Sequence, residues 1–392
     1  MMLKKLTHFF LLLTLIFSLQ SCQRKDDASQ QSGDGSQAKG NNGQGGESMP
    51  AGGTLPAGTA INFRGNIGGE NKIEMKLVRD GERLSGTYFY SKVGSNLEVR
   101  GTIDKQGNLM LKEFDASGTQ TGLFKGKWTD SETEGGVFIE GNWSKPDGSK
   151  EATFYVTEQH VEFSNGLSVV SKEIKEENKK ARYRLDVEYP QLQGAAGGSA
   201  EAFNHEVSSR ITKEINEWKS GAGLEAGEED LSYDAPEDSF DESYDVRLAN
   251  NDLVSIIFYV SVYEHGAAHP SSYSSVINYD LKQGRTLKLA NLFKPGASYL
   301  QSISAYSIKD LKRQAAKVKP DDSLLTDESI EEGATPTEDN YQNWNITAKG
   351  LMITFDPYQV GPYAAGPQRV IIPYSALRDI LDPNGPVAPL MK

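Results

Sequence analysis

The sequence predicts a mainly β protein of the α+β class. A small antiparallel β-barrel-like domain precedes a larger domain in which two main helices pack on an antiparallel sheet. Residues 60–160 are short runs of alternating apolar and polar residues separated by turn residues, a pattern typical of all-β domains. Residues 165–392 add two helical stripes to further strands. Because helices and strands do not alternate regularly, a parallel doubly wound sheet is disfavoured.

The composition limits the partners of the chain. Its 392 residues include 41 basic and 54 acidic ones, which give a formal net charge of −13. This balance argues against nucleic acid as a partner, because a basic patch is expected there. It suits attraction to cationic partners instead. The single cysteine excludes an intramolecular disulfide and a cysteine-based metal site.

Residues 1–21 have the pattern of a lipoprotein signal peptide. Two lysines precede an apolar run, Phe9 to Leu19, that is too short to span a membrane. The run ends in Leu-Gln-Ser-Cys, which resembles a bacterial lipobox and implies cleavage before Cys22 and lipidation of its thiol. Lys-Asp-Asp at 25–27 resembles a surface-export signal of Gram-negative lipoproteins. We therefore expect a lipid anchor in the membrane and a location at the outer membrane or cell surface.

The next segments are a tether and a barrel. Residues 22–59 are rich in Gly, Ser, Gln and Asn with few apolar residues, which predicts a flexible tether. Residues 60–160 hold about eight short strands, the number that closes a small barrel. Their repeated glycines indicate sharp bends or close approach of neighbouring backbones. The repeat occurs as Leu84-Gly86-Tyr88, Val99-Gly101-Ile103, Phe124-Gly126-Trp128 and Ile139-Gly141-Trp143.

The aromatic residues of this domain allow two interpretations. They line a ligand cup or they belong to a core filled by side chains, and the small size of the barrel favours the filled core. The residues concerned are Tyr88, Tyr90, Trp128 and Trp143.

The domain at 165–392 contains strands, two long helices and acidic segments. Apolar residues recur at helical spacing in Ala200–Lys219 and Ser298–Lys317. Asp252–Tyr263 predicts a buried central strand. The carboxylate-rich Glu225–Asp245 lacks calcium-ligand spacing, so it is predicted as a solvated loop or as a patch that attracts a basic partner. Pro320–Asp339 is also acidic and is predicted as a loop.

A loop with two histidines follows the predicted central strand. His265 and His269 lie four residues apart, a spacing that holds zinc when both are on one face of a helix. Gly266 and Pro270 argue against a helix, and no glutamate lies between the histidines. We therefore predict no metal and no other cofactor here.

A second loop lies between two strands near the C-terminus, within Phe355–Tyr374. Its prolines and glycines indicate a stiff backbone of specific shape. Its tyrosines are of the type that dominates recognition sites, although a structural role at the edge of the core explains them equally well. The residues concerned are Pro357, Tyr358, Gly361, Pro362, Tyr363, Gly366 and Pro367.

These two loops resemble the signature of RsiV-like domains, which occur in a lysozyme-binding anti-sigma factor and beside a peptidoglycan deacetylase. The matching pieces are Tyr263-Glu264-His265-Gly266-Ala267-Ala268-His269-Pro270, Pro357-Tyr358, Gly361-Pro362-Tyr363-Ala364-Ala365-Gly366, Ile371-Ile372-Pro373-Tyr374, and Tyr189-Pro190 ahead of Phe203-Asn204. The resemblance covers residues 165–392 and implies lysozyme binding. The residues that it implicates in partner binding are Tyr358, Gly361, Pro362, Tyr363, Gly366, His265, His269 and Pro270.

The sequence shows none of the common catalytic motifs. It lacks a G-x-S-x-G elbow, an H-E-x-x-H pair, a Walker loop and a dinucleotide fingerprint. We therefore expect a cell-envelope binding protein rather than an enzyme, with lysozyme or another cell-wall-related partner bound by the C-terminal domain. A peptidoglycan- or glycan-binding module is the first alternative. An unrecognised envelope hydrolase that uses His265 or His269 is the second.

Overall fold

The computed structural model describes residues 58, 60–69, 71–91, 93–194, 198–221, 238–318 and 323–391. The predicted signal peptide, Cys22 and nearly all of the predicted tether lie outside the described residues. So does most of the first acidic segment, at residues 222–237. Among the described residues, no helix has the length and apolar character needed to cross a membrane.

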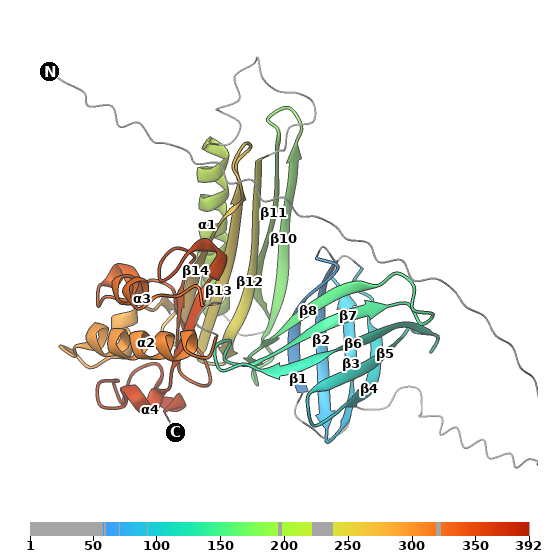
Figure 1. The fold of residues 1–392 in the computed structure, drawn as a ribbon, viewed down its shortest axis with the longest axis horizontal. Helices are drawn as coiled ribbons and strands as arrows, with labels where there is room; N and C mark the ends of the chain where they lie inside the picture. Colours follow the sequence, from blue (N-terminus) through green and yellow to red (C-terminus); the bar gives the residue numbers. More distant parts are fainter. Residues whose placement is uncertain are drawn as a thin grey trace, which may run out of the picture. The chain divides into compact units, whose positions relative to one another are not determined.

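The first eight strands form a closed antiparallel barrel, as predicted (Figure 1). Each strand pairs with the next, and β1 pairs with β8 to close the barrel, with Gly65 opposite Val156. The strands are β1 (Ala60–Ile67), β2 (Asn71–Asp80), β3 (Arg83–Tyr90), β4 (Leu97–Ile103), β5 (Asn108–Phe114), β6 (Gln120–Asp130), β7 (Val137–Ser144) and β8 (Ala152–Gln159).

The repeated glycines of the barrel lie where neighbouring backbones approach closely. A Cβ atom added to Gly86, Gly101, Gly126 or Gly141 would lie closer than 3.0 Å to a backbone oxygen of the adjacent strand. Any side chain would therefore push the strands apart. The close approach confirms the interpretation of the repeat.

Side chains fill the interior of the barrel. Phe124 makes edge-to-face contacts with Tyr88 and Phe154, with ring centroids 5.4 Å and 5.0 Å away. Buried Glu113 accepts hydrogen bonds of 2.7 Å from Tyr88 Oη and from Trp143 Nε1. The rings therefore pack on one another or bond a buried carboxylate, as the filled-core prediction requires.

Seven further strands form the second sheet. It has the order β10-β11-β12-β13-β14-β15, and β9 pairs with β12 off this path. The strands are β9 (Val161–Glu162), β10 (Ser168–Asn178), β11 (Tyr183–Gln193), β12 (Asp238–Asn250), β13 (Leu253–Tyr263), β14 (Ser271–Asp280) and β15 (Arg285–Thr286). The predicted antiparallel pairing holds for most neighbours, but β12 runs parallel to β11 and to β9. The reason is that the chain crosses over through a helix between β11 and β12 and returns to the same end of the sheet.

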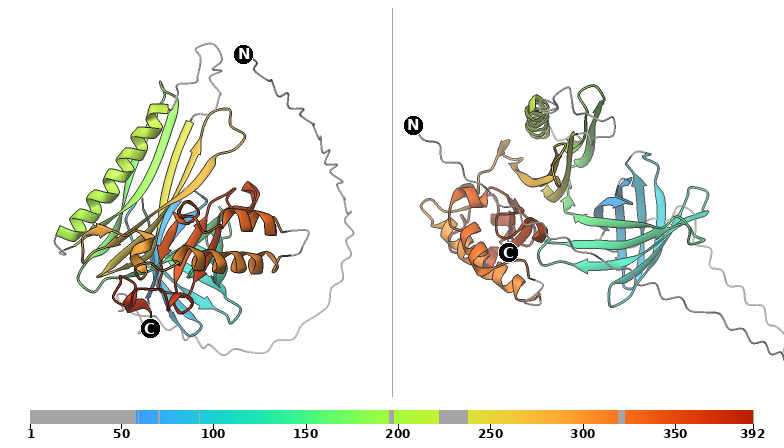
Figure 2. Two further views of the ribbon diagram at one scale, coloured as in Figure 1. Left: turned by 90° about the vertical axis from the view of Figure 1, so that its left-hand side faces the viewer. Right: turned by 45° about the horizontal axis from the view of Figure 1, so that its top comes forward.

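That crossover helix, α1 (Gly198–Gly221), covers one face of the seven-stranded sheet (Figure 2). Its apolar stripe, which includes Phe203, Val207 and Ile211, is fully buried. Alternate residues of the strands, such as Phe240 and Phe258, meet it in one core. Because strand side chains alternate between faces, the residues between them point to the other side of the sheet.

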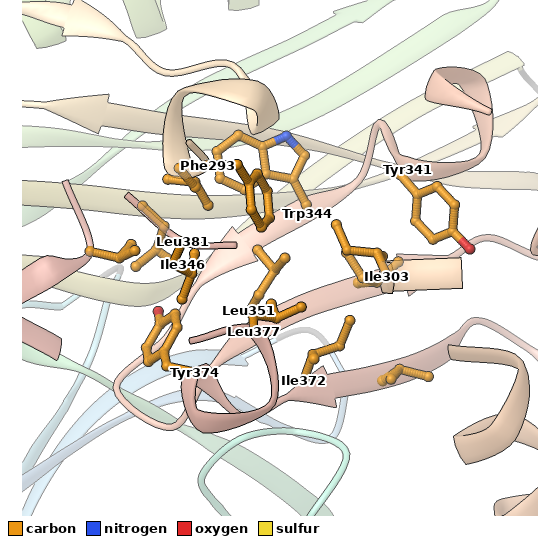
Figure 3. Close-up of a cluster of buried hydrophobic side chains, with 14 of the residues drawn as sticks. Phe293, Ile303, Tyr341, Trp344, Ile346, Leu351, Ile372, Tyr374, Leu377 and Leu381 are labelled. Carbon is orange, nitrogen blue, oxygen red and sulfur yellow. The ribbon is translucent and has the colours of Figure 1, made fainter. Parts of the chain in front are cut away.

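The second long helix packs on a sheet of its own. Helix α2 (Tyr299–Ala315) contacts the three-stranded antiparallel sheet of β16 (Trp344–Ile346), β17 (Leu351–Phe355) and β18 (Gln368–Ile372). Figure 3 shows part of this core, including Ile303 of α2 beside Leu351 and Ile372. The core also includes Leu248 and Leu253 of the larger sheet. The two predicted helices therefore belong to two different cores.

The predicted loop at 320–339 contains a short helix, α3 (Asp327–Gly333). Thr326 and Ser329 cap its start through reciprocal side-chain to backbone hydrogen bonds, in a Ser variant of the capping box. Ile330 is buried in the core beneath it. The last helix is α4 (Tyr374–Leu377).

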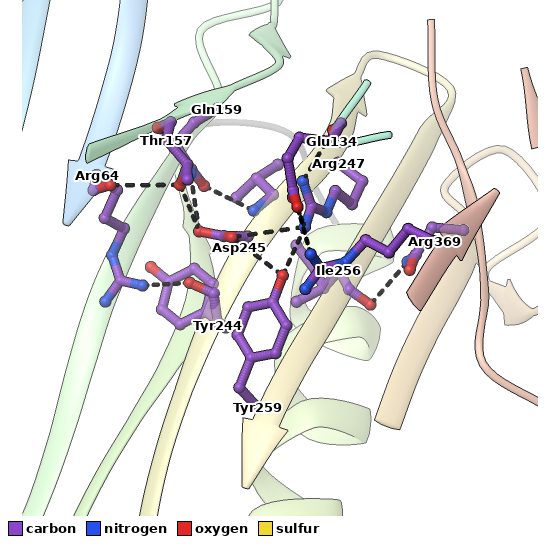
Figure 4. A network of polar contacts seen from close by, with 12 residues as sticks. Arg64, Glu134, Thr157, Gln159, Tyr244, Asp245, Arg247, Ile256, Tyr259 and Arg369 are labelled. Carbon is purple, nitrogen blue, oxygen red and sulfur yellow. Dashed lines mark hydrogen bonds and ion pairs between the residues drawn. The ribbon is translucent and has the colours of Figure 1, made fainter. Parts of the chain in front are cut away.

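A buried polar network joins the barrel to the seven-stranded sheet (Figure 4). Glu134, in the turn between β6 and β7, pairs with Arg247 of β12 and with Arg369 of β18. Asp245 accepts hydrogen bonds from Thr157 and from Gln159, at 3.1 and 2.9 Å. Both carboxylates therefore have partners from more than one sheet.

Candidate functional site

The two loops singled out in the sequence lie side by side. The loop between β13 and β14 carries His269 and Pro270, and the loop between β17 and β18 carries Tyr358 and Tyr363. The Tyr363 hydroxyl donates a 2.9 Å hydrogen bond to the Pro270 carbonyl. The rings of Tyr363 and His269 stack, with centroids 4.1 Å apart and planes at 21°. His269, Tyr358 and Tyr363 are called the aromatic cluster below.

Tyr358 is the exposed member of the cluster. Its side chain is 67% exposed, although its ring lies 5.6 Å from that of Tyr363. Its φ angle is +72°, a left-handed conformation that costs a non-glycine residue free energy. Such strain is typical of functional positions that the surrounding structure holds in place. The loop therefore holds the backbone of Tyr358 in a strained conformation that leaves its ring exposed beside Tyr363.

Glycine and proline explain how the loop keeps this shape. A Cβ on Gly361 would lie 2.5 Å from Leu325 Cδ2, so a larger residue there would require the Leu325 side chain to move. Gly366 has open space around it but a φ of +64°, so its requirement is conformational. Pro362 has φ −67° and precedes a single 3₁₀ turn, Tyr363–Ala365. These residues shape the loop and do not themselves present a chemical group.

Hydrogen bonds that the sequence did not predict fix the loop between β17 and β18, called the tyrosine loop below, to its surroundings. Asp356 accepts 3.0 Å hydrogen bonds from the Ser274 backbone N–H and one of 2.9 Å from Asn343 Nδ2. Burial raises the pKa of the Asp356 carboxyl, and these donors oppose that rise. Gln359 Nε2 donates to the carbonyls of Gly333 and Asn340. The loop is thus fixed to β14 and to the end of α3.

His265 has a partner outside the aromatic cluster. Its Nδ1 lies 2.8 Å from Asp238 Oδ1, and its backbone N–H donates to the same oxygen. Asp238 is buried at the start of β12. This contact fixes the start of the histidine loop, and the predicted role of His265 in partner binding stays a prediction.

Within the described ranges, no group of three or more His, Cys, Asp or Glu side chains is placed to hold a metal ion. The chemistry that the site offers consists of ring faces, one imidazole and hydroxyl groups. Ring faces and hydroxyls of this kind serve recognition by stacking, apolar contact and hydrogen bonding.

Profiles of two protein families match adjoining parts of the chain. The profile of DUF3298, a protein family of unknown function, matches residues 290–375, and that of the deacetylase PdaC matches residues 175–272. The first segment contains Tyr358 and Tyr363, and the second contains His269 and Pro270. The aromatic cluster therefore lies where the two matched segments meet in space.

A curated relative is similar to part of the chain. It is the peptidoglycan-N-acetylmuramic acid deacetylase PdaC of Bacillus subtilis (strain 168), which is 32% identical over 129 residues. The match covers 33% of this chain, and the chain spans only 26% of the length of that protein.

Two solved structures are also similar. A DUF3298-family protein from Bacteroides fragilis NCTC 9343 is 18% identical, with a TM-score of 0.41, over 58% of this chain and 98% of its own. A DUF3298-family protein from Pseudomonas aeruginosa PAO1 is 17% identical, also with a TM-score of 0.41, over 56% of this chain and 94% of its own.

Proposed function

We propose that this chain is a binding protein of the bacterial cell envelope and that the aromatic cluster contacts a cell-wall-related partner, lysozyme in the first instance. The observation that carries the proposal is the exposed ring of Tyr358, held at φ +72° beside Tyr363 and His269. An aromatic group that is already ordered loses little conformational entropy on binding. The similarity to a peptidoglycan deacetylase supports a setting in the cell wall.

The charges beside the tyrosine loop support a basic partner. Helix α3 carries four carboxylates, at Asp327, Glu328, Glu331 and Glu332. Two of them share the single cation Lys312. The helix adjoins the loop, since Ser329 Oγ donates to the Val360 carbonyl. Lysozymes are commonly basic enzymes, and such carboxylates attract a basic partner from a distance.

The experiment measures binding of hen lysozyme to the protein at low and high salt. We expect binding at low salt, with association that slows as salt screens the charges. Tyr358→Ala combined with Tyr363→Ala is expected to weaken the affinity by about tenfold or more, which corresponds to the loss of an aromatic anchor. Tyr155→Ala, at an exposed tyrosine of the barrel, is the matched control and is expected to leave the affinity unchanged.

Several outcomes contradict the proposal. Absence of lysozyme binding at low salt rejects lysozyme as the partner, and an unchanged affinity of the double variant rejects the aromatic cluster as its site. Binding of uncharged cell-wall fragments that ignores salt but needs both tyrosines would favour a glycan-binding module. Turnover of such fragments that is lost in His265→Ala would favour a hydrolase.

The proposal includes a lipid anchor at Cys22, which lies outside the described residues. It rests on the charged start, the short apolar run and the lipobox-like end of the leader. Cys22→Ala is expected to prevent lipidation and to move the protein out of the membrane fraction. An unchanged distribution between fractions rejects the anchor.

A further inference from the structure

A groove of about 890 Å³ lies on the face of the seven-stranded sheet that points away from α1. Its floor consists of residues that alternate with the buried residues beneath the helix. One row crosses four strands, because Asp186 pairs with Asp241, Asp241 with Ser261, and Ser261 with Ser272. A second row includes Ser243.

Two separate parts of the chain form the walls. Gly69 and Lys72, from the β1–β2 region of the barrel, line the groove together with Asp356, Pro357 and Pro367 of the tyrosine loop. Tyr358 and Tyr363 are not among the lining residues. The groove is therefore a second site, beside the aromatic cluster rather than part of it. Its volume lies in the range of sites that enclose small ligands.

Hydroxyl groups give the floor its chemistry. Ser243, Ser261 and Ser272 line the groove, and none of them makes a side-chain hydrogen bond to any residue in the described ranges. Each hydroxyl can donate one hydrogen bond and accept two. β-branched residues commonly cover a pleated surface, and serine is smaller than they are. The three serines therefore leave both space and hydrogen-bonding capacity for a ligand.

Both cations that line the groove, Lys72 and Arg184, are paired with carboxylates, which outnumber them in the lining. Arg184 makes a two-pronged contact with Asp241, at 2.9 and 3.2 Å. Lys72 lies 3.0 Å from Asp186 and 3.2 Å from Glu188. Since each of these cations already has a carboxylate partner, the groove offers an anionic ligand little free positive charge, whereas its carboxylate oxygens can accept hydrogen bonds. It offers a neutral ligand paired charges and free hydroxyls.

We propose that this groove binds a neutral, polyhydroxylated ligand, a short oligosaccharide. The serine hydroxyls and the carboxylate oxygens would bond the sugar hydroxyls, while Pro357 and Pro367 offer apolar surface to the C–H faces of the sugar rings. The site goes beyond the proposed function, because it uses different residues and a different class of ligand.

Calorimetry of the protein with three uncharged probes tests the proposal: chitotetraose, cellotetraose and maltotetraose. We expect at least one to bind, and the identity of the one that binds distinguishes an N-acetylated glycan from a plain glucan. Ser261→Val with Ser272→Val removes two hydroxyls and fills the floor, and it is expected to weaken binding by about tenfold or more. If that variant does not fold, Ser243→Val on the neighbouring strand provides the same test.

The controls separate this site from the aromatic cluster. Ser271→Val, on the same strand but with the side chain on the opposite face, is expected to keep oligosaccharide binding. So is the Tyr358→Ala, Tyr363→Ala variant, which tests the proposed function through lysozyme. Failure of all three probes to bind at about 10 mM, or equal binding by the folded valine variants, overturns the proposal whatever the outcome with lysozyme.

Discussion

Two carboxylates share one cation beneath helix α1. Glu242 of β12 and Glu214 of α1 each lie 2.8 Å from Arg210 Nη2. Burial, together with the neighbouring Glu214, raises the pKa of Glu242 to about 7 against the attraction of Arg210. Burial also raises the pKa of Glu214. One guanidinium compensates two neighbouring carboxylates incompletely, so protonation of Glu242 is favoured in the folded protein below about pH 7.

This arrangement predicts that stability falls as the pH rises. The carboxyl of Glu242 has an ordinary pKa of 4.5 and a pKa of about 7 in the folded protein. Its protonation therefore stabilises the fold fully below pH 4.5, and that contribution, about 3 kcal/mol, is lost as the pH rises through 7. Glu242→Gln is expected to flatten this dependence in urea unfolding between pH 5 and 8. Glu217→Gln, at an exposed site on the same helix, should leave it intact, and an unchanged slope in Glu242→Gln refutes the assignment.

At the residue scale, the sequence predicted groups with their own local signal. His269, Pro270, Tyr358 and Tyr363 follow strands in short loops rich in glycine and proline, and the structure brings these four together. It could not predict Asp356, because the backbone N–H of Ser274 that it accepts is 82 residues away. A lone aspartate at a strand end has no distinctive pattern until its partners are known.

The close pairing of the barrel strands depends on single glycine residues. Gly101 of β4 lies against the backbone oxygen of Met110 on β5, where a Cβ has no room. The same holds for Gly86 and Gly141 against their own neighbours. Strands of a closed barrel cannot separate locally without disturbing the pairing around the whole ring.

Gly101→Ala is therefore expected to destabilise the protein by about 3 kcal/mol, since the added methyl group forces the strands β4 and β5 apart. Gly198→Ala adds the same methyl group at the start of α1, where nothing lies within 4 Å, and should change stability by less than about 0.5 kcal/mol. Urea unfolding of both variants measures the difference. Equal stability of the two would show that the backbone contact is tolerant.

At the element scale, periodicity predicted the barrel strands and both long helices. It did not predict α3, because the segment is acidic and has too few apolar residues for a helical repeat. Its helix depends on a capping box and on one buried residue, Ile330. It also did not predict the parallel pairing of β11 and β12. The direction of β12 relative to β11 depends on the end at which the chain returns to the sheet after α1, and no local sequence pattern predicts that end.

At the scale of the whole molecule, Glu134 is shared by three parts of the chain. Its carboxylate comes from the barrel, whereas Arg247 and Arg369 come from the larger and the smaller sheet. Arg247 is buried and Arg369 is largely buried, with side chains 5% and 14% exposed. Removing the carboxylate would leave two buried cations with fewer partners, a change that typically costs 3–5 kcal/mol.

Glu134→Ala is accordingly expected to loosen the barrel from the sheets. The sequence predicts a domain boundary near residues 160–171, and exposed Asn165 and Gly166 offer a protease site there. After cleavage, the natural barrel is expected to co-elute with the remainder in size-exclusion chromatography, whereas the Glu134→Ala barrel separates. Glu132→Ala, at an exposed carboxylate two residues away, should behave like the natural protein. If the two fragments of the cleaved natural protein separate without any substitution, the network does not hold them together.

The boundary stays a prediction from the sequence, and the sequence did not predict the contacts across it. The composition changes from glycine-punctuated strands to a charged segment near residue 165, and such a shift is visible locally. Glu134 and Arg369 lie 235 residues apart, and each reads as an ordinary surface charge in its own neighbourhood. They form an ion pair that joins the barrel to the other sheets only in the folded protein.

The single carbonyl of Pro270 has a consequence for how the chain tolerates exchange with its relatives. It accepts a hydrogen bond from Tyr363 Oη and lies 2.8 Å from His269 Nδ1, so it is one of the points at which the PdaC-like and DUF3298-like segments meet. A chimaera that takes only one segment from a homologue combines one ring of the Tyr363–His269 stack with a partner from a different protein. Recombination, natural or engineered, should therefore succeed more often when both segments travel together.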